Sequence, residues 1–102
     1  MIKLTADEMA IVKAILAQHV PDCEVWAFGS RVTGNAHPYS DLDLVIHGLA
    51  ALGWEKIAAI KQSFSESKLP FMVDVVDWWA ISSEFQGIIS QNYVALQLPQ
   101  VR

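Results

Sequence analysis

The chain has 102 residues, 53% of them hydrophobic, and carries a net charge of −4 from 7 basic and 11 acidic residues. This length fits one domain, spanning 1–102, with one modest core. No apolar run reaches the roughly 18–20 residues that cross a bilayer, and no basic stripe suits nucleic-acid binding. The first residues lack the apolar stretch of a secretory signal, and the single cysteine excludes an internal disulfide. These properties predict a cytoplasmic protein with no membrane and no direct nucleic-acid partner.

The first predicted elements are a helix over about 6–19 and a strand over 23–28. Thr5 and Glu8 form a capping box before apolar residues at helical spacing. Pro21 ends this helix, and Gly29 closes the strand that follows.

A loop over 35–40 leads into a second strand over 41–47 and a helix over about 53–67. Because side chains alternate along a strand, one face of 41–47 points to the core and the other carries acids. The two faces are Leu42, Leu44 and Ile46, and Asp41, Asp43, Val45 and His47. The helical face comprises Trp54, Ile57, Ile60, Lys61 and Phe64, and Lys61 can pack its stem there while its charge stays in water.

A third strand over 71–76 and a last helix complete the prediction. Ser82 or Ser83 caps that helix, which runs to about 95. The order α-β-β-α-β-α predicts an α+β (mixed α/β) fold, with a small mixed β-sheet and flanking helices.

Three acids and a Gly-Ser turn form the candidate site. Asp41 and Asp43 share a strand face, and Gly29-Ser30 lies ten residues earlier, as a turn whose backbone N–H groups can meet a phosphate. Asp74 interrupts an apolar strand, which is costly without a partner. If the strands are neighbours, each pair of carboxylates ~4 Å apart costs about 4 kcal/mol at an effective dielectric near 20. Either some of these acids are protonated or a divalent cation neutralises them. Mg²⁺ suits such ligands and shares its shell with substrate phosphates. Asp77 follows with opposite parity, so helix capping is its simpler role.

With this order and spacing, Gly29-Ser30, Asp41-x-Asp43 and Asp74 resemble the nucleotidyltransferase fold of the DNA polymerase β superfamily. The resemblance is closest to its minimal members, the MNT-type antitoxins paired with HEPN toxins, and covers nearly the whole chain. It implies that Gly29 and Ser30 bind the triphosphate of ATP. It also implies that Asp41 and Asp43 bind two Mg²⁺ ions, and that Asp74 ligates one and helps activate the acceptor hydroxyl. Such members transfer AMP to a tyrosine of the HEPN toxin, an RNase, and release pyrophosphate.

The chain departs from this family pattern at one position. Many relatives have Ala-Arg-Gly where Val32-Thr33-Gly34 stands here, so an arginine at position 33 is missing. Arg31 is the candidate substitute, since a guanidinium pairs well with phosphate oxygens; a surface role is the alternative.

The last quarter of the chain is unusually apolar and is expected to supply a partner-binding surface as well as core. Its apolar residues are Trp78, Trp79, Phe85, Ile88, Ile89, Tyr93, Val94, Leu96 and Leu98. An alternative function is a catalytically degenerate antitoxin that neutralises its toxin by binding and occlusion alone. The missing arginine favours this alternative, and the three intact acids oppose it.

Overall fold

A four-stranded sheet organises the computed structural model, which describes residues 2–100. Its strand order is β3-β2-β1-β4, so β3 and β4 are the edges. β1 pairs antiparallel with both β2 and β4, whereas β2 and β3 are parallel. The predicted α+β fold with a small mixed sheet and flanking helices is therefore confirmed. In chain order the elements are α1 (Ala6–His19), β1 (Glu24–Phe28), α2 (Ser30–Thr33), β2 (Leu42–His47), α3 (Trp54–Ser65), β3 (Val73–Asp77), the 3-10 helix η1 (Trp78–Ala80), α4 (Ser83–Gln91) and β4 (Val94–Gln97).

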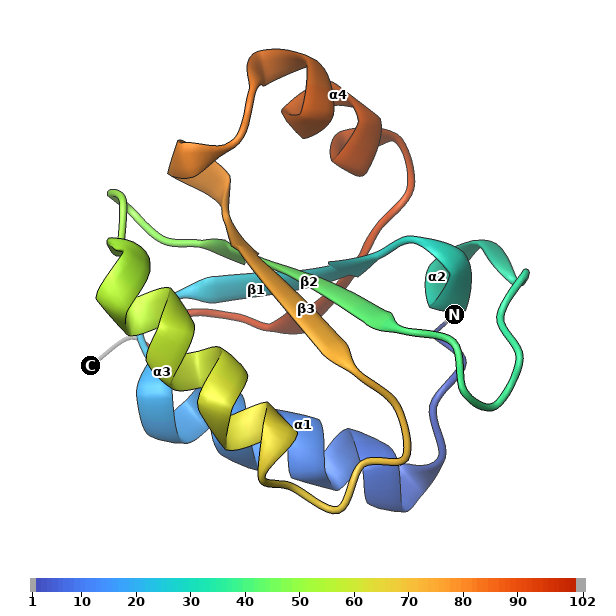
Figure 1. Ribbon diagram of the computed structural model, residues 1–102. Coiled ribbons are helices and arrows are strands. Elements are labelled where there is room, and N and C mark those ends of the chain that lie inside the picture. Colours follow the sequence, from blue (N-terminus) through green and yellow to red (C-terminus); the bar gives the residue numbers. More distant parts are fainter. Residues whose placement is uncertain (1, 101–102) are drawn as a thin grey trace.

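The main core lies between the sheet and the helices α1 and α3, which cover one face (Figure 1). The capping box starts α1 as predicted: the Thr5 hydroxyl accepts from Glu8 N, and Thr5 N donates to the Glu8 carboxylate. The predicted inward face of β2 is also confirmed. The fully buried residues of this core include Val12, Leu16, Val25, Leu42, Leu44, Ile46 and Ile60.

A second, smaller cluster covers the opposite face of the sheet, where η1 and α4 lie (Figure 1). Val45 on β2 is fully buried there, against Trp26 and Ile89. The alternation predicted for β2 is therefore correct, and the face that carries Asp43 becomes apolar further along the strand. This arrangement leaves the acids at one end of the sheet.

Besides shifts of one or two residues at the ends of strands and of α3, three features differ from the prediction. The short helix α2 follows Gly29 directly, where no element was expected. The last helix ends at Gln91 rather than near 95, because Asn92 is extended and the chain then forms β4 beside β1. Trp54, expected on the core-facing side of its helix, is 79% exposed because it begins α3, beyond the packed turns. From residue 2 to residue 100, no helix is both long enough and apolar enough to cross a membrane.

Candidate active site

The Gly-Ser turn joins the end of β1 to α2 and lies against the second strand. Gly29 has a φ of +82°, a conformation that L side chains rarely adopt. A Cβ atom at this position would also collide with the carboxylate of Asp43. Both facts require glycine. The missing side chain lets the backbone approach Asp43, while Ser30 begins α2 and is half-buried.

Asp43 and Asp74 are directly opposite each other on the parallel strands β2 and β3. Residues in register on neighbouring strands point to the same face, and strands lie about 4.8 Å apart. Two carboxylates are therefore held side by side by the sheet itself. The candidate site depends on these two strands being neighbours in the sheet, and the structure confirms that they are.

Asp41 lies one residue before β2 and is exposed, and it lines the same hollow as Asp43 and Asp74. This hollow, named here the acidic cleft, has a volume of about 640 Å³. Its other walls come from α3 and from the segment that leads into β3. The structure thus gathers all three predicted acids around one cleft.

The negative charge in the cleft is reflected in the pKa of Asp43. Burial raises the pKa of this carboxyl above its ordinary value, and the charges of Asp74 and then Asp41 raise it further. Each cause penalises the ionised form. The site therefore has more negative charge than the protein alone balances.

Lys61 on α3 provides a partial balance. Its ammonium lies 3.7 Å from Asp74 Oδ1, with both side chains about half exposed. The placement agrees with the prediction that the stem packs while the charge stays in water, but nothing in the sequence assigns Lys61 to the site. The contact between Lys61 and Asp74 has no local sequence signature, because it depends on how α3 packs beside the edge strand β3.

The three carboxylates are chemically suited to bind a divalent cation. Carboxylate oxygens are the ligands that Mg²⁺ prefers, and a cation beside Asp43 would offset the charges of Asp74 and Asp41, which add to burial in raising its pKa. As arranged, no three Asp, Glu, His or Cys side chains within residues 2–100 form a closed metal cluster. Asp74 is instead turned to Lys61. Holding an ion jointly therefore requires these side chains to reorient.

Arg31 occupies a different environment from the one its predicted phosphate contact requires. It is 3% exposed, and its guanidinium donates to the carbonyls of Lys3, Pro38 and Ser40 at 2.8–3.0 Å. Its Cζ also lies 3.9 Å from the centroid of the Phe71 ring. Arg31 therefore ties the loop before β2 to the N-terminal segment. Contact with a phosphate stays a prediction, and it would require leaving these carbonyls.

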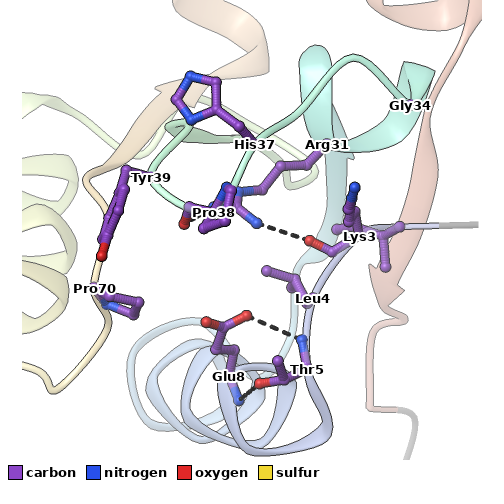
Figure 2. A pocket seen from close by; sticks show the side chains of 11 residues that line it. Lys3, Leu4, Thr5, Glu8, Arg31, Gly34, His37, Pro38, Tyr39 and Pro70 are labelled. Carbon is purple, nitrogen blue, oxygen red and sulfur yellow. Dashed lines mark hydrogen bonds between the residues drawn. The ribbon is translucent and has the colours of Figure 1, made fainter.

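A second hollow, of about 750 Å³, lies beside Arg31 and is named here the N-terminal pocket. Figure 2 shows Arg31 directed at the Lys3 carbonyl, with Tyr39 and Pro70 on the opposite wall. None of the three acids lines this pocket. Its greater volume does not make it the better candidate, since the groups suited to phosphate-transfer chemistry line the acidic cleft.

The apolar C-terminal quarter divides between core and surface. Ile89 and Leu96 are buried, in the two separate clusters. Trp79, Ile88, Tyr93 and Leu98 remain exposed, at 50%, 63%, 41% and 66%. Asp77 has the predicted capping role: it accepts from Trp79 N and also from Leu52 N. The indole of Trp79 is held by a 2.8 Å bond to the Gly48 carbonyl.

Comparison with known proteins identifies the family. The family model described as a nucleotidyltransferase domain matches residues 9–97. The probable protein adenylyltransferase MntA of Haemophilus influenzae is 50% identical over 94 residues, which are 92% of this chain and 82% of that protein.

Two solved complexes share the fold. One is the crystal structure of a toxin–antitoxin with AMP-PNP, with a TM-score of 0.77 at 22% identity, covering 90% of this chain and 74% of that one. The other is a tri-AMPylated Shewanella oneidensis HEPN toxin in complex with MNT antitoxin, with a TM-score of 0.68 at 21% identity, covering 90% and 71%. The predicted enzyme class is confirmed: this chain belongs to the nucleotidyltransferase domain family.

Proposed function

We propose that this protein is a Mg²⁺-dependent adenylyltransferase that transfers AMP from ATP to a tyrosine hydroxyl of a HEPN-family toxin and so acts as its antitoxin. The observation that carries the proposal is the pairing of Asp43 with Asp74 across β2 and β3, beside a glycine that admits the Asp43 carboxylate. The names of the relatives, an adenylyltransferase and antitoxins bound to toxins, support the choice of donor and acceptor. We expect the protein to act in the cytoplasm as one catalytic domain.

The residues divide the work by position. Asp41, Asp43 and Asp74 would hold two Mg²⁺ ions, whose Lewis acidity stabilises the attacking and leaving oxygens when they are bound. Gly29 and Ser30 bring backbone N–H groups to the triphosphate, since the first N–H groups of a helix such as α2 have no partner within it. These groups position the α-phosphorus for attack rather than forming a covalent bond.

The transfer forms one bond to phosphorus and breaks another. The acceptor oxygen forms a bond to the α-phosphorus of ATP, and the bond between that phosphorus and the oxygen bridging to the β-phosphate breaks. Pyrophosphate leaves, and the acceptor becomes an AMP phosphodiester. Asp74 takes the proton of the acceptor hydroxyl and passes it to solvent. A phenol with a pKa near 10 needs less help than an alcohol to lose this proton.

The partner surface we propose is the exposed apolar set of the C-terminal region: Trp79, Ile88, Tyr93 and Leu98. An aromatic side chain held rigid by its own hydrogen bond, as Trp79 is, loses little entropy on binding. This surface would orient the toxin so that its tyrosine reaches the cleft.

The test is transfer of label from ATP carrying a radioactive α-phosphate. Incubation of the protein with Mg²⁺ and a HEPN-family toxin should give a labelled toxin. Asp43→Asn should abolish labelling, and Asp22→Asn, an exposed acid before β1, should not. A stable complex that silences the toxin without any label would show inhibition by occlusion and refute the transferase proposal.

A further inference from the structure

One basic residue lines the acidic cleft, and its charge pairs with one of the acids there. Of the residues that line it, only Lys61 is basic. The ammonium contacts Asp74 at 3.7 Å and makes the only ion pair found among residues 2–100. At about half exposure, the side chain is long and free enough to move within the cleft.

The helix α2, which follows Gly29, cannot supply this charge in the present arrangement. Position 33 is a threonine, and the Arg31 guanidinium is buried against three backbone carbonyls and an aromatic ring. A triphosphate entering beside three carboxylates nevertheless needs positive charge from the protein as well as from metal ions. Lys61 is placed to provide this positive charge, from α3 rather than from α2.

We propose that Lys61 has two successive partners: it pairs with Asp74 in the empty site, and it binds the β- and γ-phosphates of the nucleotide once Asp74 turns to a cation. The inference rests on the proposed function. A cation that takes Asp74 as a ligand competes with the ammonium for the negative charge of the same carboxylate. The released ammonium then remains in a cleft lined by Asp43, the residue that Gly29 adjoins, and a point charge on a flexible stem suits the phosphate oxygens of a nucleotide bound there.

Two binding measurements on Lys61→Met should move in opposite directions. Without nucleotide, Mn²⁺ binding followed by electron paramagnetic resonance should tighten by about threefold, because Asp74 no longer has a competing ammonium. With Mg²⁺ present, AMP-PNP binding followed by calorimetry should weaken about tenfold, the lower range for a hydrogen bond to a charged group at a half-exposed site. AMP, which lacks the β- and γ-phosphates, should bind the variant and the wild type within about twofold. A variant that only disturbed the fold would weaken all three.

Lys61→Arg keeps the charge and should bind AMP-PNP within about threefold of wild type. Lys68→Met removes an exposed lysine that does not line the cleft and should change nothing. Unchanged AMP-PNP affinity in Lys61→Met, or weaker Mn²⁺ binding, would overturn the inference. Wild-type protein that binds neither Mn²⁺ nor AMP-PNP would instead refute the proposed function, so the two failures are distinguishable.

Discussion

Without metal ions, the variant Asp43→Asn should be more stable than the wild type. In the presence of Mg²⁺, it should be less stable than the wild type. The substitution keeps the shape that fits beside Gly29 and removes one of the charges facing Asp74. Two charges about 5 Å apart repel by about 0.8 kcal/mol in water and about 3 kcal/mol at an effective dielectric of 20. Because the Asp74 side chain is 57% exposed and pairs with Lys61, the lower part of this range applies. We expect a gain of about 1 kcal/mol, or about 4–8 °C in Tm for a domain of this size.

The pH dependence of this gain follows from the raised pKa of Asp43. Below about pH 4, the carboxyl is protonated in the folded and unfolded chains alike, so the variant and the wild type should have equal stability. As pH rises through the raised pKa of the folded state, the wild type alone acquires the unfavourable charge. The difference in Tm should therefore open above about pH 4 and be complete once the pH exceeds the raised pKa of the folded state.

Magnesium should make the wild type more stable than Asp43→Asn. At ten times its Kd, a ligand that binds only the folded state stabilises it by about 1.4 kcal/mol, and Asp43→Asn should lose this stabilisation. The assay is thermal unfolding followed by circular dichroism, with EDTA or with Mg²⁺, and Asp22→Asn is the matched control. A lower Tm for Asp43→Asn in EDTA at pH 7, or a gain that persists below pH 4, would refute the crowding of charge at this site.

Three further substitutions test separate parts of the structure. Gly29→Ala should cost at least about 1 kcal/mol of unfolding free energy because its φ is +82° and its Cβ meets Asp43, and it should abolish AMP-PNP binding; normal binding would refute the close approach. Arg31→Met should cost roughly 3 kcal/mol in urea unfolding, since three carbonyls lose their donor; a cost under about 1 kcal/mol would show that they find other partners. Trp79→Ala should weaken toxin binding about 30-fold in calorimetry, or about 2 kcal/mol, and an unchanged Kd would exclude this surface.

The parts of the fold that local chemistry determines were predictable. The Thr5–Glu8 capping box and the alternation along 41–47 depend on residues near in sequence, and both are as expected. The convergence of Asp74 on Asp43 was also predictable, because an acid within an apolar strand needs a polar neighbour.

The features that were missed depend on distant contacts. β4 is four residues long and extends only because it pairs with β1 at the sheet edge. Val94 and Leu96 alternate, but they also continue the apolar run of α4, so a helix to 95 was an equally good fit. The burial of Arg31 depends on carbonyls from the N-terminal segment, 28 residues away in sequence for Lys3. Neither its partners nor the Lys61 contact has a signature in the local sequence.

The most direct test of the central claim is a crystal structure of the protein with AMP-PNP and Mn²⁺, collected for the anomalous signal of manganese. We expect manganese bound by the carboxylates of Asp41, Asp43 and Asp74, with the triphosphate against Gly29 and Ser30. Nucleotide seated in the N-terminal pocket of Figure 2, with no manganese between β2 and β3, would contradict this claim.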